Sequence, residues 1–376
     1  MSSNKRVVVF APLFKRLPTH GYGAIEKLTL ERVRSLKRAG YKVQFVGPID
    51  DLNFTDEVIN VEKTYRFPSN TISRSLSLLN LSWTKYMKEF INLRRNVWDA
   101  PILSDAAAMD PFNNFFLAKN YGINRIIFFL HGNFYTSNGI GRYLFAPMDL
   151  FTNVSKKINF APLNYALFNY MKSNGYKVKY MPSGADFPSS DKIITNPKDY
   201  AIFIGVINQY KAPHLAIKLA KKIGIRLLLI GPSYDKGYFD KFILPNLDER
   251  IRYLGEVDRS NLDELLRNSK CLFFTSTWNE PQGLVILEAL SWGVPVLSLK
   301  PGPFSGSFDM ISQGETGYIG NFDDVVANSE QIFSLKRREI QAKASSKWSW
   351  NNIIKNYYDN AITEMQSEIS GMKKNA

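Results

Sequence analysis

Two glutamates, Glu280 and Glu288, lie on either side of a predicted helix start at Gly283. The short apolar run before them predicts a buried strand, and the apolar periodicity after them predicts a helix. The amides of Gly283, Leu284 and Val285 fall in the first helical turn, where backbone N–H groups lack intrahelical acceptors. Such a helix start binds anions and suits the phosphates of a nucleotide.

The two glutamates are expected to reach opposite ends of one bound molecule. Pro281 disfavours helical backbone at the residue before it, so Glu280 should lie outside the helix. Glu288 lies one to two turns inside the helix and can reach the hydroxyl pair of a ribose. Glu280 would then contact a sugar carried by the phosphates. For an isolated pair of glutamates, two surface positions would be the simpler reading, but here the strand, the proline and the glycine favour a site.

The elements that would position this site follow a strand–helix alternation that occurs twice along the chain. Predicted strands cover residues 6–12, 41–47, 101–103, 126–130, 200–205, 226–231, 251–254, 271–275 and 294–299. Predicted helices cover residues 25–39, 72–95, 110–121, 212–223, 283–292 and most of the tail after 336. A turn-rich segment near 182–198 separates the two halves.

This alternation predicts an α/β protein with two Rossmann-like, doubly wound parallel-sheet domains that face a central cleft. The predicted domains are an N-terminal one over residues 1–185 and a C-terminal one over residues 186–349. A C-terminal helix over residues 350–376 is expected to pack back toward the N-terminal domain. Ligands in such sheets bind beyond the carboxyl ends of the strands.

Composition excludes several classes of protein. The single cysteine, Cys271, rules out an intrachain disulfide, and three histidines leave little material for a nitrogen- and sulfur-ligated metal site. The acidic pairs at 50–51 and 323–324 are expected in turns or loops, as solvated surface and not as metal ligands. No apolar stretch approaches the roughly 20 residues that cross a bilayer, so we expect a cytoplasmic protein.

The net charge of +14 is unevenly distributed. Residues 1–190 hold 25 Lys and Arg against 13 Asp and Glu, whereas residues 191–376 hold 23 against 21. Either the basic half meets an anionic partner or the charge is only a solvated surface; both interpretations remain open. The segment 74–88 mixes Leu, Trp and Tyr with cations, so it fits either an anionic membrane surface at the inner face of the membrane or a packed helix. No recognisable nucleic-acid-binding module is present, and we expect no nucleic acid as a partner.

Residues 280–290, Glu-Pro-Gln-Gly-Leu-Val-Ile-Leu-Glu-Ala-Leu, resemble the signature of family-four retaining glycosyltransferases of the GT-B fold, the glycosyl transferases group 1. Other segments extend the resemblance along nearly the whole chain. They are the glycine loop at 21–26, the strand-end histidine at 129–132, the interdomain linker at 182–186, the phosphate-binding turn at 203–211 and the loop at 314–317.

The resemblance implies an enzyme that moves a hexose from a nucleotide-sugar to a glycan, a lipid-linked oligosaccharide or another acceptor, with retention and with no cofactor or metal. It implies that Lys211 binds the diphosphate and stabilises its charge as it leaves. It also implies that His131 hydrogen-bonds the transferring sugar and that the backbone at Gly23 approaches the donor. By the same resemblance Glu280 contacts the sugar and Glu288 the ribose. The resemblance also implies that the N-terminal domain, residues 1–185, binds the acceptor and that the C-terminal domain, residues 186–349, binds the nucleotide-sugar. No carboxylate stands as an obvious covalent nucleophile, so we expect same-face attack assisted by the leaving phosphate.

The sequence departs from the family at several positions. Relatives carry an arginine where Val206 stands, so one of two cations expected on the diphosphate is absent there. Ala24 replaces a glycine, Gln282 replaces a common aromatic residue, and Asp309 stands where relatives often place a glutamate. A catalytically impaired relative that binds a nucleotide-sugar or scaffolds a complex is therefore the main alternative. A nicotinamide-dependent oxidoreductase is disfavoured, because the glycines near Gly23 lie too far beyond the first strand and lack a third glycine.

Overall fold

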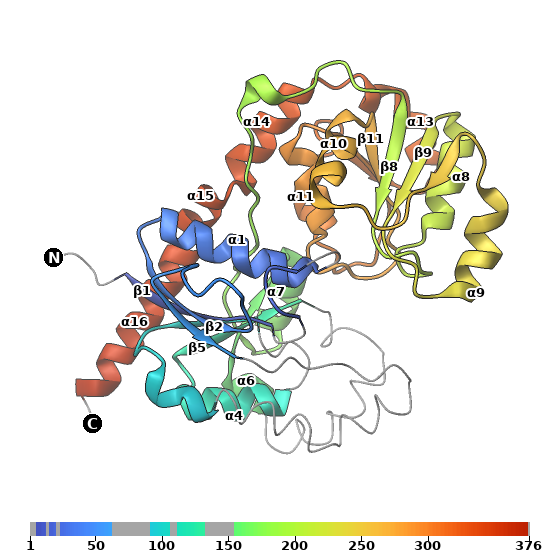
Figure 1. The fold of residues 1–376 in the computed structure, drawn as a ribbon. Helices are drawn as coiled ribbons and strands as arrows, with labels where there is room; N and C mark the ends of the chain where they lie inside the picture. The colour runs from blue at the N-terminus through green and yellow to red at the C-terminus, as the bar shows by residue number, and fades with distance from the viewer. Residues whose placement is uncertain are drawn as a thin grey trace. The chain divides into compact units, whose positions relative to one another are not determined.

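The computed structural model describes residues 5–12, 15–19, 23–61, 91–105, 111–131 and 154–374. The chain divides into two compact units, one of Met1–Ser183 with Ile353–Ala376 and the other of Gly184–Asn352. In Figure 1 the first unit runs from blue to green and includes the red C-terminal helix. The candidate membrane segment at 74–88, Gly21 and Gly132 lie outside the described residues.

A seven-stranded parallel sheet forms the centre of the first unit. In sheet order the strands are β3 (Glu57–Asn60), β2 (Lys42–Gly47), β1 (Arg6–Phe10), β4 (Ile102–Ser104), β5 (Ile126–Leu130), β6 (Asn159–Pro162) and β7 (Lys177–Val178). The central strands are buried on both faces because helices cover the sheet, which is why their sequences read as continuous apolar runs.

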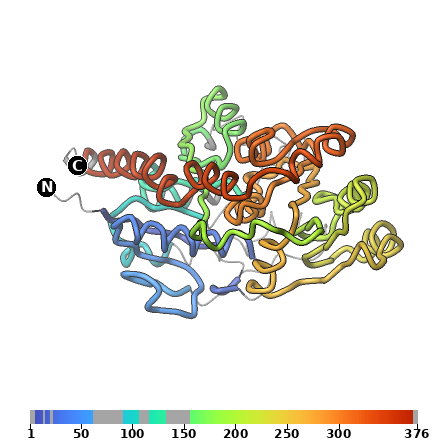
Figure 2. The backbone as a smooth tube through the Cα atoms, turned by 90° about the horizontal axis from the view of Figure 1, so that it is seen from above, coloured from blue at the N-terminus to red at the C-terminus, as the bar shows by residue number. Residues whose placement is uncertain are grey.

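The helices of the first unit include a segment from the end of the chain. They are α1 (Ala24–Arg38), η1 (Leu93–Asn96), α4 (Pro111–Tyr121), α6 (Val154–Lys157), α7 (Tyr165–Ser173), η5 (Ile354–Tyr358) and α16 (Asp359–Lys374). The C-terminal segment (red) lies next to α1 (blue) in Figure 2, where Arg32 Nε donates to the Tyr358 hydroxyl at 3.2 Å. Lys179 and Glu364 form an ion pair at 2.5 Å, so the returning chain is fixed at two places on the unit.

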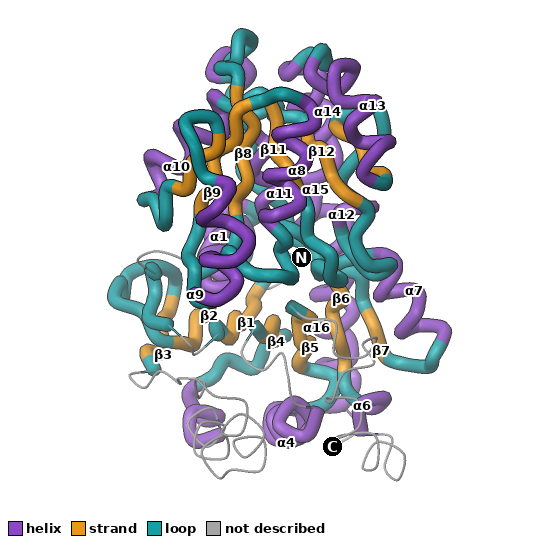
Figure 3. Tube along the Cα trace, turned by 90° about the vertical axis from the view of Figure 1, so that its right-hand side faces the viewer, coloured by secondary structure: helices purple, strands orange, loops and turns teal. Residues whose placement is uncertain are grey.

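A six-stranded parallel sheet forms the centre of the second unit. In sheet order the strands are β10 (Ile251–Tyr253), β9 (Arg226–Ile230), β8 (Tyr200–Ile204), β11 (Cys271–Phe274), β12 (Val296–Leu299) and β13 (Gly317–Gly320). The strands lie side by side between two layers of helices (Figure 3). The strand order reverses between β8 and β11, which is where sheets of this kind place their ligands.

The helices of the second unit cover both faces of its sheet. They are α8 (Pro213–Ile223), α9 (Lys236–Tyr238), η3 (Phe239–Ile243), η4 (Leu244–Asn246), η2 (Ser190–Lys192), α10 (Arg259–Asn268), α11 (Leu284–Ser291), α12 (Ser307–Met310), α13 (Phe322–Phe333), α14 (Arg337–Trp348) and α15 (Trp350–Ile353), the last reaching the boundary between the units. On one face, α8 and α13 enclose a core with Phe203, Leu229 and Phe273 from the strands. On the other face α11 packs against α14.

Two local expectations are wrong in detail. Asp323 and Asp324 are not in a loop: they occupy the first turn of α13, where acidic side chains interact favourably with the helix dipole. The sequence pattern did not predict strands β3, β7 and β13, because they are short and half exposed and no buried apolar run marks them. It did not predict β6 either, although β6 is buried, because its four residues begin with Asn159 and end with Pro162.

Candidate functional site

The expected donor residues of the second unit lie at the carboxyl ends of β8 and β11, which are adjacent strands. Lys211 follows β8, while Glu280 and Gly283 follow β11. Because the two strands are parallel, the loops after them meet at the same edge of the sheet. The structure therefore brings Lys211 and Glu280 together although 69 residues separate them in the chain.

Lys211 and Glu280 form an ion pair between Nζ and Oε2. Both side chains are mostly buried, with 22% and 14% of their surface exposed. The indole Nε1 of Trp278 donates to the same Glu280 oxygen at 2.7 Å, and Lys211 Nζ lies 5.6 Å from the centre of the Trp278 ring. The ammonium group has three donors, so it can keep Glu280 and still bind an anion.

Hydrogen bonds close the turn before Lys211 and join the two loops. The Asn208 side-chain oxygen accepts from the Lys211 amide at 2.9 Å, which closes the turn after β8. The Thr277 amide donates to the Tyr210 carbonyl at 2.9 Å, and the Thr275 hydroxyl donates to the Lys211 carbonyl at 3.1 Å. The cation is therefore held at a defined place, as transition-state stabilisation requires.

Helix α11 begins at Leu284, one residue later than the prediction. Gly283 stands before it with a φ of 78° and a ψ of 62°, in the left-handed region that favours glycine. The amide of Ile286 is the one that donates back to the Gly283 carbonyl, at 2.8 Å. The amides of Leu284 and Val285 have no recorded acceptor among the described residues, so this helix start can bind an anion.

Glu288 lies in the middle of α11 and is engaged by a residue that the sequence did not single out. Its Oε1 accepts from Nη1 of Arg259, the first residue of α10, at 2.8 Å. Arg259 is also paired with Asp263, through Nη2 at 2.7 Å and Nε at 3.1 Å. The carboxylate expected to contact the ribose is thus held in place by a guanidinium group.

The turn before Lys211 depends on a close approach of two glycines. Gly231 has a φ of 136°, and a Cβ there would lie 2.1 Å from the Gly205 carbonyl oxygen. Val206 directly follows Gly205 and is half-buried. It stands where the resembled family carries an arginine. That the diphosphate lacks a second cation at this turn stays a prediction.

In the first unit, His131 belongs to a buried polar cluster at the ends of β4 and β5. Its Nε2 lies 2.7 Å from Oδ1 of Asp105, and its side chain is 5% exposed. The other carboxylate oxygen of Asp105 accepts from the Thr29 hydroxyl at 2.7 Å and from Nη1 of Arg32. The Arg32 guanidinium also stacks on the Phe129 ring at 3.8 Å. That His131 reaches the sugar of a donor stays a prediction.

Charge balance determines the protonation of this cluster. Burial alone would raise the pKa of Asp105, but Arg32 and the hydrogen bonds from His131 and Thr29 hold that pKa below its ordinary value. Burial raises the pKa of Glu26 on α1. Gly23 precedes α1, and a Cβ at this position would lie 2.5 Å from the Thr19 hydroxyl oxygen, so a side chain there would have to displace Thr19.

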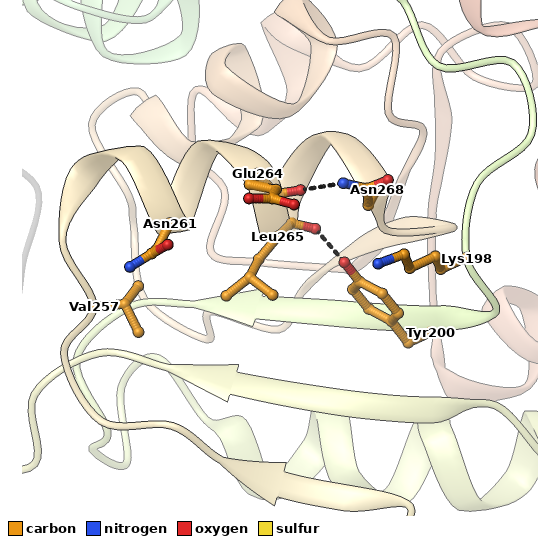
Figure 4. A pocket seen from close by; sticks show the side chains of 7 residues that line it. All are labelled: Lys198, Tyr200, Val257, Asn261, Glu264, Leu265 and Asn268. Carbon is orange, nitrogen blue, oxygen red and sulfur yellow. Dashed lines mark hydrogen bonds between the residues drawn. The ribbon is translucent and has the colours of Figure 1, made fainter.

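A cavity of about 350 Å³ lies elsewhere in the second unit (Figure 4). It is lined by Lys198, by Tyr200 at the amino end of β8 and by residues of α10, and the Tyr200 hydroxyl donates to the Leu265 carbonyl at 2.7 Å. This is the end of β8 opposite to Lys211, so the cavity is separate from the candidate site.

The described part of the chain contains neither a cluster of metal ligands nor a membrane-spanning helix. No group of three or more His, Cys, Asp or Glu side chains there is arranged to hold a metal ion. Of the helices described, none combines the length and the apolar character needed to span a bilayer.

The fold and the site define a two-unit α/β protein with an open helix start at the switch point of its second sheet. Residues 188–352 match the family model described as glycosyl transferases group 1. N-acetyl-alpha-D-glucosaminyl L-malate synthase of Bacillus anthracis is 29% identical over 123 residues, which are 32% of this chain and 31% of the relative. D-inositol 3-phosphate glycosyltransferase of Mycolicibacterium paratuberculosis is 28% identical over 194 residues, 46% of this chain and 43% of the relative. The chain thus spans less than half the length of the curated relatives it matches.

Solved structures resemble the whole chain. Sucrose-phosphate synthase from Thermosynechococcus elongatus has a TM-score of 0.70 and 14% identity, with 99% of this chain and 100% of that chain covered. The Anabaena protein HepE, in complex with UDP and glucose, has a TM-score of 0.63 and 15% identity, with 97% and 100% covered. The fold is therefore GT-B, and the second unit resembles the group 1 glycosyl transferases.

Proposed function

We propose that the protein is a retaining glycosyltransferase that moves a hexose from a nucleotide-sugar to a carbohydrate acceptor. The observation that carries this proposal is the Lys211–Glu280 pair beside the start of α11. A cation and open amides at one sheet edge suit the diphosphate of a nucleotide-sugar, and the carboxylate beside them suits hydroxyls of its sugar. The family match over residues 188–352 and the UDP bound to HepE support the same donor class.

Each part of the donor has a proposed contact in the second unit. The diphosphate binds the Leu284 and Val285 amides and the Lys211 ammonium group. The ribose hydroxyls donate to Glu288, and Glu280 accepts from hydroxyls of the sugar. Lys211 and Glu280 pair with each other in the structure. The hydrogen-bond donors and acceptors that the nucleotide-sugar needs are therefore already in place, and they only exchange partners when it binds.

The reaction breaks the bond between the anomeric carbon and the phosphate oxygen. The electron pair stays on the diphosphate, where Lys211 and the helix-start amides stabilise the developing charge. The acceptor hydroxyl attacks from the face that the diphosphate leaves, and its proton passes to the departing phosphate oxygen. Because Lys211 and the amides supply the positive charge, the proposed reaction proceeds without a metal ion.

The configuration of the product tests this mechanism directly. Proton NMR of the first-formed product is expected to show the anomeric configuration of the donor, and an inverted centre would rule out the same-face route. Turnover is expected to survive EDTA. Loss of turnover in EDTA with recovery on added magnesium or manganese would contradict the metal-free proposal.

The proposed acceptor is a glycan or a lipid-linked oligosaccharide, used in the cytoplasm at the inner face of the membrane. The support is the excess of cations in residues 1–190, which attracts anionic surfaces. Flotation with phosphatidylserine-containing vesicles at low salt is expected to carry the protein along. If the protein stays at the bottom of the gradient, the membrane part of the proposal fails.

A second candidate is a nucleotide-sugar-binding relative with little catalysis, and Val206 favours it. With one cation fewer on the diphosphate, the donor would bind and the bond would seldom break. Substitution Val206→Arg then separates the two. In an impaired relative it should raise nucleotide-sugar hydrolysis by an order of magnitude or more, about the effect of one charged donor on a transition state. An unchanged high rate favours the enzyme with Lys211 as its sufficient cation.

A further inference from the structure

Arg259 lies between two carboxylates at the start of α10. Its Nη2 and Nε contact the two oxygens of Asp263, at 2.7 and 3.1 Å. Its remaining amino group, Nη1, lies 2.8 Å from Oε1 of Glu288. A guanidinium group is planar and carries its donors in a fixed fork. The two contacts with Asp263 therefore set the direction in which Arg259 holds Glu288.

This arrangement contributes little to the stability of the fold. The Arg259 side chain is 46% exposed, and those of Asp263 and Glu288 are 31% and 21% exposed. Ion pairs with this much solvent access stabilise a protein only weakly. Two carboxylates on one guanidinium group thus point to a role in binding, at the residue that the proposed function assigns to the ribose.

We infer that Arg259 is a positioning residue that orients Glu288 for the two ribose hydroxyls of the donor, and so selects ribonucleotides. This inference rests on the proposed function, because Glu288 is the ribose contact in that proposal. A carboxylate offers about four acceptor sites, and Arg259 occupies one of them on Oε1. A carboxylate that is already held also loses less rotamer freedom when the ligand arrives.

The inference predicts that the effect of Arg259 depends on the ribose hydroxyls. The probes are UDP, GDP and ADP and their 2′,3′-dideoxy forms, titrated calorimetrically into the full-length protein. Arg259→Ala is expected to weaken binding of the preferred ribonucleotide by about two- to fivefold, the range of a part-exposed charged contact. It should leave binding of the dideoxy form unchanged. Arg259→Lys keeps the charge but not the fork, and should restore only part of the affinity.

Lys270→Ala is the matched control. It removes a surface ion pair of the same unit, between Lys270 and Asp199 at 2.9 Å, at the amino end of β11 and so at the opposite edge of the sheet. Both nucleotide forms should bind it as they bind the unchanged protein. Thermal melts of the variants confirm that each is folded before it is titrated.

The outcomes separate the inference from the proposed function. If Arg259→Ala keeps the full preference for the ribonucleotide while Glu288→Ala loses it, the inference is wrong and the nucleotide site stands. Equal weakening of both nucleotide forms in Arg259→Ala also overturns it, since the effect would not pass through the ribose. If the unchanged protein binds none of the nucleotides, the proposed function fails and takes the inference with it.

Discussion

Gly231→Ala is expected to destabilise the second unit strongly, because a methyl group has no space at that position. Its Cβ would lie 2.1 Å from the Gly205 carbonyl oxygen and 2.7 Å from the carbonyl carbon, and ordinary contacts begin near 3.4 Å. The obstructing atoms are backbone, so β8 and β9 must separate. Overpacking of this kind costs about 1–3 kcal/mol, and the φ of 136° adds a strain of about 1–3 kcal/mol.

The matched control is Gly224→Ala, after α8. Gly224 also has a positive φ, 82°, but a Cβ there would meet nothing within 4 Å. Its cost should be the backbone strain alone, about 1–2 kcal/mol. Urea denaturation gives both free energies of unfolding, and hydrogen exchange of the β8 and β9 amides locates the change. Equal destabilisation by the two substitutions would refute the close approach of Gly205 and Gly231.

Three further predictions test other parts of the structure. Because Arg32 holds the pKa of Asp105 low, the folded unit binds fewer protons at Asp105 than the unfolded chain does. The ionised Asp105 therefore stabilises the folded unit above its ordinary pKa of 3.8, and this stabilisation is lost as the pH falls below that value. Asp105→Asn should remove that acid-sensitive component and cost about 3–5 kcal/mol at pH 7 by leaving Arg32 buried without its charge partner; an unchanged acid titration by circular dichroism would contradict this. Lys211→Met should lower turnover of the preferred nucleotide-sugar about 100-fold, with a smaller loss in Lys211→Arg, and equal rates in steady-state assays would exclude a charge-stabilising role. Cys271 is fully buried with a raised pKa, so a thiol reagent should modify it only after unfolding, and rapid labelling of the native protein would contradict its position in β11.

The sequence predicted those parts of the site that lie within one strand–loop–helix unit. Glu280, Gly283 and Glu288 stand close in the chain, and the proline and the glycine between them determine which residues are helical. The two sheets were predictable for the same reason, since buried parallel strands appear as apolar runs. Lys211 was assigned by resemblance, and its pairing with Glu280 follows from the adjacency of β8 and β11.

Contacts between distant segments could not be predicted from local patterns. Arg259 reaches Glu288 across 29 residues, and Arg32 reaches Asp105 across 73. Both arginines lie in amphipathic helices, where a charged residue normally reads as solvated surface. Asp105 directly follows a buried strand, so its place at a strand end was a usable signal. Such pairs depend on how distant segments are aligned in the fold, and the hydrophobic periodicity of each segment does not reveal that alignment.

Release of nucleoside diphosphate from UDP-, GDP- and ADP-sugars by the full-length protein is the measurement that tests the central claim most directly. The unchanged protein is expected to release nucleotide from one donor class. Glu280→Ala should release it about 100-fold or more slowly, as expected when a group in contact with the reacting sugar is lost. Lys270→Ala, at the opposite edge of the sheet, should match the unchanged protein. No release from any donor, or release at the same rate in Glu280→Ala, would contradict the account.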